Sequence, residues 1–308
     1  MQCLLKKFRI STFGSYVRSV FMSWSPLALE HQSILDSQWK TLCQQNGIVL
    51  SEYSFPNNFL FRKQHAYEVK HIDNLVLVRG VSRSGENFLI PTFHPDRLSK
   101  ERILELLKIA PLFPIPDQWL DCFKDFPVQA RYNRDQSDYL FSVDKLKTLP
   151  GRKLSSRRNL LHQLTQEHEV HTESFCECDY TDALQVLEKW QKQSSFPADE
   201  TDFYPCQEAL KHLKPFQFMG RMCYVDGAPV AFTIGEKLTP STAILHFSKA
   251  LHAIKGLTPF LYEDFAAHLS EDTLWINLEQ DLGIPSLRQA KEAYEPDQLV
   301  NKWWISLV

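Results

Sequence analysis

A dense cluster of basic side chains lies between residues 145 and 158, with no acid in that stretch. Arginine forks pair well with phosphate oxygens, and the start of a following helix adds a favourable dipole. The cluster therefore predicts a phosphate-bearing partner: a tRNA acceptor end, a phospholipid headgroup or a coenzyme. The alternative is a solvated helix start, although cations are badly placed there for the helix dipole. The six cations are Lys145, Lys147, Arg152, Lys153, Arg157 and Arg158.

A second group of polar side chains follows the strand predicted over residues 273–278. Asn277, Glu279 and Asp281 alternate there, which places them on one side of an extended chain. A carboxylate at this position could accept a proton from an attacking amine or hold an ammonium group. Asp281 has a second interpretation, because it could cap the helix that begins near Pro285. Glu279 is therefore the stronger candidate for acid–base chemistry.

Further candidates lie near the neighbouring predicted strand, residues 242–247. Histidine titrates near neutral pH, so His246 could move a proton, although a lone histidine in a strand is more often a core residue. Lys249 could stabilise negative charge that develops on an oxygen atom. Arg288 and Lys291 lie three residues apart on one face of a predicted helix, where they could contact a substrate or only solvent.

The seven cysteines are an odd, scattered set, which is typical of reduced thiols in a cytosolic protein. Cys176 and Cys178 are close together, and His168 and His171 precede them, so a zinc site is one interpretation. The spacing differs from the usual pairs of zinc ligands. We therefore interpret this group as structural and expect neither a metal nor a tightly bound cofactor.

The composition argues against several other classes of protein. The ten glycines form no G-x-G, so there is no dinucleotide fingerprint. Glu86 and Asn87 follow Gly80 and Gly85 where a P-loop needs a lysine and a hydroxyl. A net charge of −3 argues against nucleic-acid binding over the whole surface. No apolar run of about 18 residues predicts a membrane-spanning helix.

Hydrophobic periodicity predicts helices and strands in both halves of the chain. In the first half we expect helices over residues 25–47, 98–110 and 116–126, and strands over 58–61, 67–72, 75–78 and 88–90, with a hairpin turn at Asp73-Asn74. In the second half we expect strands over 139–143, 216–225, 229–237, 242–247, 273–278 and 302–307, with a hairpin turn at Asp226-Gly227. Helices are expected there over 155–168, from Thr181, and over 207–213, 258–269 and 285–294.

This order of elements is similar to that of the GNAT acyltransferase fold, in which two parallel strands splay and hold an acyl donor. We therefore expect an α/β (α+β) chain of two tandem GNAT-like domains, each a mixed twisted sheet flanked by helices, over residues 25–130 and 131–308. In acyl-coenzyme A members of that fold a glycine-rich loop binds the pyrophosphate. Here Lys255 and Gly256 occupy that place, and Gly256 alone of the loop's glycines is kept.

The first 24 residues carry four cations and no acid. Arg18 interrupts their apolar run, which argues against a signal peptide. We expect either a basic segment that contacts an anionic membrane surface or a translation start at Met22.

Several segments resemble the family similar to the C-terminal domain of phosphatidylglycerol lysyltransferases, long filed as a domain of unknown function. They read YLFSVDKLKTLPGRKLSSRRNLL (139–161), VDGAPVAFTIGEKLTPSTAILHFSKA (225–250) and EQDLGIPSLRQAKEAYEPDQLVNKW (279–303), with weaker similarity in FLFRKQHAYEV (59–69). Ser248 stands where this family usually has a carboxylate, and Leu251 where it has an aspartate. The flippase half of the lysyltransferases is absent from this sequence.

The resemblance implies an acyl or aminoacyl transferase, with aminoacyl-tRNA favoured over acyl-coenzyme A as the co-substrate and an amine or hydroxyl as the acceptor. It implies a cytoplasmic location, with peripheral contact to anionic lipid at the inner face of the membrane. The alternative is a degenerate GNAT-like module that binds tRNA, lipid or a protein. We expect Glu279, His246 and Lys249 to be catalytic. The expected substrate- or anion-binding residues are Arg152, Lys153, Arg157, Arg158, Asn159, Lys255, Gly256, Asn277, Asp281 and Arg288.

Overall fold

The computed structural model describes residues 23–72 and 75–308. The basic extension expected at the N-terminus therefore lies outside the described residues, apart from Ser23 and Trp24. The turn expected at Asp73-Asn74 also lies outside them.

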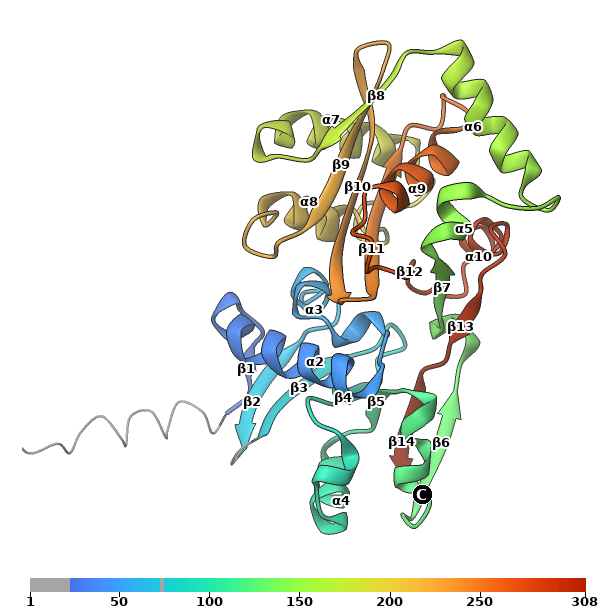
Figure 1. Cartoon of the computed structure of the whole chain (residues 1–308). Coiled ribbons are helices and arrows are strands. Elements are labelled where there is room, and N and C mark those ends of the chain that lie inside the picture. Colours follow the sequence, from blue (N-terminus) through green and yellow to red (C-terminus); the bar gives the residue numbers. More distant parts are fainter. Residues whose placement is uncertain (1–22, 73–74) are drawn as a thin grey trace, which may run out of the picture.

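The first sheet has seven strands in the order β1-β2-β3-β4-β5-β14-β6 (Figure 1). β4 and β5 run in parallel, and the other neighbours are antiparallel. The strands are β1 (Ser25–Pro26), β2 (Glu68–Ile72), β3 (Leu75–Val81), β4 (Asn87–Ile90), β5 (Leu112–Ile115), β6 (Val128–Tyr132) and β14 (Trp303–Leu307).

The last strand of the chain, β14, returns to this first sheet. Its expected place was in the second half, so that expectation was wrong. The physical reason lies in its aromatic residues, because the Trp304 ring stacks on Phe113 with 4.3 Å between centroids and packs edge-on against Phe88. These contacts bury Trp304 in the core of the first sheet.

The helices of the first half are α2 (Gln32–Asn46), α3 (Phe55–Leu60) and α4 (Lys100–Ile109). A strand was expected over residues 58–61, but these residues belong to α3 or end it. The Ser54 side chain accepts the N–H of Asn57 and Pro56 lies in the first turn, and both features favour a helix start. Short 3-10 helices complete this half: η1 (Leu29–His31), η2 (Ser51–Tyr53), η3 (Pro95–Arg97), η4 (Asp117–Phe123) and η5 (Arg134–Gln136).

The second sheet also has seven strands, in the order β13-β7-β12-β11-β10-β9-β8. β11 and β12 run in parallel, and their pairing ends at Ile244 and Asn277. β11 continues beyond that point, so the two strands are free to diverge there. The strands are β7 (Asp138–Ser142), β8 (Val170–Ser174), β9 (Met219–Val225), β10 (Ala228–Thr239), β11 (Thr242–Ala250), β12 (Trp275–Asn277) and β13 (Gln298–Val300).

Helices flank this second sheet on both sides. In Figure 1, α7 and α8 lie to the left of the long strands β9 to β11, whereas α9, α5 and α6 lie to the right. The helices are α5 (Val143–Thr148), α6 (Ser155–Glu167), α7 (Tyr180–Gln193), α8 (Phe203–Lys211), α9 (Leu257–Ala267) and α10 (Pro285–Glu292), and the 3-10 helix η6 (Glu177–Asp179) precedes α7.

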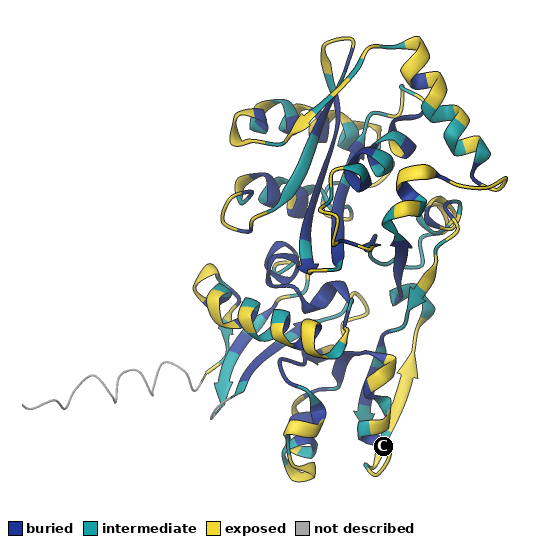
Figure 2. Cartoon of the chain, viewed as in Figure 1, coloured by how far each residue is buried: buried dark blue, intermediate teal, exposed yellow. Residues whose placement is uncertain are grey.

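Helix α3 is buried along its whole length where the two halves meet (Figure 2). Phe55 and Phe59 pack edge-on against Phe216 of the second half, with ring centroids 6.0 and 5.2 Å away. One apolar core therefore extends through both sheets. Because of this packing, Ser54, directly before α3, contacts Glu236 of strand β10 in the second sheet.

Candidate functional site

His246 lies at a bulge in β11. Ile234 of β10 pairs with Phe247 and Gly235 pairs with Leu245, so His246 is the extra residue on its strand. A bulge turns a side chain away from the regular alternation of a strand. Gly235 allows the close approach here, because a Cβ atom at this position would lie 2.3 Å from the Ile244 carbonyl oxygen.

The imidazole of His246 is held between two carboxylates. Its Nδ1 lies 2.8 Å from Glu279 Oε1, and its Nε2 lies 3.0 Å from Glu236 Oε1. Burial alone would lower the pKa of His246, but the hydrogen bonds to Glu236 and Glu279 outweigh burial and raise the pKa to about 9. At neutral pH the ring is therefore an imidazolium that donates both N–H groups and cannot accept a proton.

The turn after β12 places Glu279. Its backbone has a positive φ of 57°, and its N–H donates to Asn277 Oδ1 at 2.6 Å. The Lys291 ammonium donates to the carbonyls of Leu278 and Gln280, each at 2.6 Å, and burial lowers the pKa of this lysine to about 8. The Glu279 side chain keeps 19% of its surface exposed, whereas the His246 side chain that it binds has 0% exposure.

Asp281 lies two residues further on, in a closed environment. Its side chain has 0% exposure and accepts hydrogen bonds from Arg134, Arg288, the Tyr139 hydroxyl and the Gly283 N–H. Burial would raise the pKa of Asp281, but these hydrogen bonds lower it well below its usual range. The carboxylate closes a turn and connects β7, η5 and α10, whereas α10 begins without a side-chain cap.

Asn277 is buried at the end of β12, where it joins the two halves. Its Nδ2 donates to the Val49 carbonyl at 2.7 Å and to Asp138 Oδ2 at 2.8 Å. Asp138 in turn pairs with the fully buried Lys302, which also binds Glu52 at 2.7 Å. The alternation expected for Asn277, Glu279 and Asp281 does not describe their contacts, because the left-handed backbone at Glu279 separates them.

Lys249 has partners of its own, away from the carboxylates around His246. Its ammonium pairs with Asp202 at 2.6 Å and lies 3.6 Å above the centre of the Trp190 ring. The side chain is buried against α7 and the start of α8.

Several members of the basic cluster bind other parts of the chain. Arg158 donates to the carbonyls of Leu149 and Gly151, Lys153 pairs with Glu295 at 2.8 Å, and Lys145 binds Asp297. Arg157 is half-buried beside the Tyr294 ring, and its Nε has no hydrogen-bond partner among the described residues. The exposed members are Lys147, Arg152 and Lys153, and Asn159 is also exposed.

Gly256 directly precedes α9 and has a φ of +88°. A Cβ atom there would lie 2.3 Å from the Leu160 carbonyl oxygen of α6, so the glycine allows these two helices to pack closely. Lys255, directly before it, is exposed.

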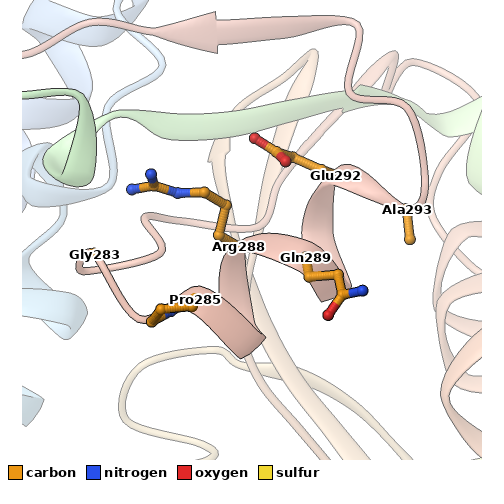
Figure 3. A pocket seen from close by; sticks show the side chains of 6 residues that line it. All are labelled: Gly283, Pro285, Arg288, Gln289, Glu292 and Ala293. Atoms are coloured by element: carbon orange, nitrogen blue, oxygen red, sulfur yellow. The ribbon is translucent and has the colours of Figure 1, made fainter.

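A hollow of about 430 Å³ lies along α10 (Figure 3). Figure 3 shows Arg288 and Glu292 pointing to the same side of the helix, and Gln289 to another. Arg288 binds Asp135 and Asp281, whereas Glu292 binds Arg134 at 2.6 Å. The hollow therefore adjoins the closed cluster around Asp281 and not the carboxylate of Glu279. Its lining residues are Gly283, Pro285, Arg288, Gln289, Glu292 and Ala293.

Comparison with known protein families assigns the chain to one of them. The family described as phosphatidylglycerol lysyltransferase, C-terminal, matches residues 47–306, which is most of the sequence. The chain belongs to this family. No curated protein matches it. No helix within residues 23–72 and 75–308 is long and apolar enough to cross a membrane.

Three solved structures are similar in fold to this chain. A conserved protein of unknown function from Bacteroides thetaiotaomicron VPI-5482 is 19% identical with a TM-score of 0.79, over 93% of this chain and all of the other. L-PGS from Bacillus licheniformis is 14% identical with a TM-score of 0.57, over 88% and 91% of the two chains. FemX is 8% identical with a TM-score of 0.57, over 93% and 98%. The expected tandem GNAT-like fold is confirmed.

Two groups of side chains in this family member have the composition of metal ligands: His94, Asp96 and Cys122, and Cys176, Cys178 and Asp179. Cys176 and Cys178 form a disulfide, so reduced thiols were the wrong expectation for this pair. The group at Cys176 and Cys178 contains Asp179 and neither His168 nor His171, so the structure does not bring the two histidines and two cysteines together as one zinc site.

Sequence reasoning missed two residues at the site, Glu236 and Ser54. Ser54 donates a hydrogen bond to Glu236, which also binds His246. The signal for Glu236 was an isolated acid within the apolar run of β10, since buried carboxylates are rarely found without a partner. Ser54 offered only the pattern of a helix cap, and its contact with the second sheet depends on the packing of α3.

Proposed function

We propose that this chain transfers an aminoacyl group from charged tRNA to an amine or hydroxyl acceptor, with Glu279 at the reacting atoms. Membership of a family described as the C-terminal domain of phosphatidylglycerol lysyltransferase supports this chemistry. The observation that carries the proposal is the Glu279 carboxylate, on a partly exposed side chain, fixed by the imidazolium of His246 where β11 and β12 are no longer paired.

In the proposed reaction the acceptor nitrogen or oxygen attacks the ester carbonyl carbon of the donor. A new bond to that carbon forms, and the bond from the carbon to the tRNA ribose oxygen breaks. Glu279 accepts the proton that the acceptor loses and passes it to the ribose oxygen, which leaves as a hydroxyl. His246 keeps its own protons and orients Glu279. In a second role consistent with this geometry, Glu279 holds the ammonium group of the donor.

Replacing the carboxylate tests this proposal. Glu279→Gln keeps the shape of the side chain and should lower transfer from charged tRNA by about 10²–10⁴-fold, the usual contribution of a positioned acid or base. The matched control is Glu271→Gln, which removes the same charge from an exposed residue before β12. Transfer that survives Glu279→Gln unchanged would reject the catalytic role and favour the alternative of a binding module without catalysis.

The exposed members of the basic cluster are the proposed binding groups for tRNA phosphates. Lys147→Glu combined with Arg152→Glu should weaken tRNA binding and reduce the slope of log K against log salt by about 1 for each phosphate that is no longer neutralised. Arg158 is a poor choice for this test because it binds the carbonyls of Leu149 and Gly151. Lys108→Glu, on the exposed face of α4, is the control. Equal affinity and equal slope would leave the cluster as ordinary surface.

Acyl-coenzyme A is the other donor class that this proposal considers. Its expected binding residues were Lys255 and Gly256, and the close packing on α6 is a sufficient reason for a glycine at this position. Isothermal titration with coenzyme A separates the donors. Saturable binding that Lys255→Ala weakens would favour the acyl-coenzyme A donor over tRNA.

A further inference from the structure

Ser54 connects the first half of the chain to the cluster around His246. It lies 3% exposed at the start of α3, where its Oγ accepts the N–H of Asn57 at 3.1 Å and donates to Glu236 Oε1. The Asn58 amide donates to the Ser54 carbonyl at 2.7 Å. The hydroxyl is thus fixed by its own helix while it reaches a strand that lies 182 residues away in sequence.

Glu236 receives hydrogen bonds from both sides. The same oxygen, Oε1, accepts from Ser54 and from His246 Nε2, and the side chain is buried on β10. A buried carboxylate is costly without such partners. The groups therefore form one chain of hydrogen bonds, from Ser54 to Glu236, to His246 and to Glu279. Of these four hydrogen-bonded residues, Glu279 has the most exposed side chain.

We propose that Ser54 and Glu236 are positioning residues of the transfer site, which hold His246 with its Nδ1–H directed at Glu279. The inference rests on the function proposed above and adds that the first half of the chain completes a site built on the second sheet. Neither residue is proposed to touch the substrate, because both are buried and reach Glu279 only through His246.

Among the groups around His246, Glu236 is the one that can hold the ring on the side away from Glu279. Phe218 packs edge-on against the imidazole, with 5.7 Å between ring centroids, and carries no charge. The Cys43 thiol, on α2, faces Glu236 and stays protonated, because burial and the charge of Glu236 raise its pKa. The charge of Lys291 interacts with that of Glu279, the other carboxylate bound to the ring. Glu236 and Glu279 are thus the carboxylates that hydrogen-bond the ring, and without Glu236 the ring loses its second anchor.

Kinetics of matched variants give the first measurement. Glu236→Gln should lower kcat about 10–100-fold with little change in KM, because a misplaced supporting group loosens the geometry of the reacting one. Ser54→Ala should lower kcat less, and Ser54→Thr, which keeps the hydroxyl, should restore it. Ser99→Ala is the control, because Ser99 caps α4 in the same way at 3.2 Å from the Arg102 nitrogen. A Ser54→Ala effect no larger than that of Ser99→Ala would overturn the role of Ser54.

Titration of the His246 ring, followed by NMR on protein with ¹⁵N-labelled histidine, gives a readout that does not depend on activity. In the wild type the ring should remain an imidazolium well above neutral pH. In Glu236→Gln the titration should move down by a pH unit or more, while Ser99→Ala should leave it in place. An unmoved titration together with wild-type kinetics would overturn the inference even if Glu279→Gln abolished transfer. A wild-type protein without transfer, but with the expected shift, would reject the proposed function and leave the contact from Ser54 to His246 intact.

Discussion

Glu279 and Asp281 are carboxylates two residues apart, yet the structure treats them in opposite ways. Asp281 is closed off and accepts from two arginines, a tyrosine hydroxyl and a backbone N–H. Glu279 lies at the end of a chain of buried groups, hydrogen-bonds His246, and keeps part of its surface open. The comparison shows that the number of donors and the exposure, rather than the residue type, separate a structural carboxylate from a candidate base.

The largest expected effect on stability concerns the closed carboxylate. Asp281→Asn should lower the free energy of unfolding by about 2–4 kcal/mol, because it removes a buried partner of Arg134 and Arg288; the cost lies below that of a fully buried pair since both arginines are partly exposed. Glu279→Gln should cost less, because its amide oxygen can still accept from His246. Denaturant unfolding of the two variants measures this. An equal loss of unfolding free energy in the two variants would mean that the two carboxylates contribute equally to stability.

The next effect tests the turn that separates the two carboxylates. Lys291→Met removes the ammonium that binds the carbonyls of Leu278 and Gln280, and should lower the free energy of unfolding by about 1–3 kcal/mol through unsatisfied buried carbonyls. It should also lower transfer, because Glu279 lies within this turn. The control Lys189→Met, on the exposed face of α7, should stay within about 0.5 kcal/mol of the wild type. A wild-type free energy of unfolding in Lys291→Met would show that the turn does not need the hydrogen bonds from Lys291.

Much of the second sheet could be predicted from the sequence, because its long strands β10 and β11 are nearly continuous buried runs and the Asp226-Gly227 turn fixes one hairpin. The strand expected over residues 58–61 was wrong, because the cap at Ser54 favours a helix, and this helix is buried along its whole length. The place of β14 depends on aromatic contacts with residues almost 200 positions earlier, which no local pattern contains.

The candidate site could be predicted only in part, for a similar physical reason. Glu279 and His246 stood out by residue type and by their place near strand ends, and the structure brings them together. Alternation then placed Asp281 beside Glu279, but the positive φ at Glu279 turns the chain between them. Ser54 reaches Glu236 through packing between the halves, and such contacts leave no periodic signal in the sequence.

The smallest expected effect is a pair of opposite pH dependences. The folded-state pKa of His246 is raised to about 9, so its contribution to stability is full below its ordinary pKa of about 6.5 and is lost as the pH rises through about 9. The pKa of Asp281 is lowered, so its contribution is full above its ordinary pKa of about 3.9 and is lost as the pH falls below that value. Lys291 acts in the opposite direction at alkaline pH, because its lowered pKa of about 8 favours the folded state as the pH rises, so each effect is measured as a difference from the wild type. In urea unfolding from pH 3 to 10, the stability difference between the wild type and His246→Gln should shrink as the pH rises towards 9, and the difference between the wild type and Asp281→Asn should shrink as the pH falls below 4. If His246→Gln left the alkaline slope unchanged, the ring would not be held as an imidazolium, and Glu279 would lack the fixed cation that distinguishes it from Asp281.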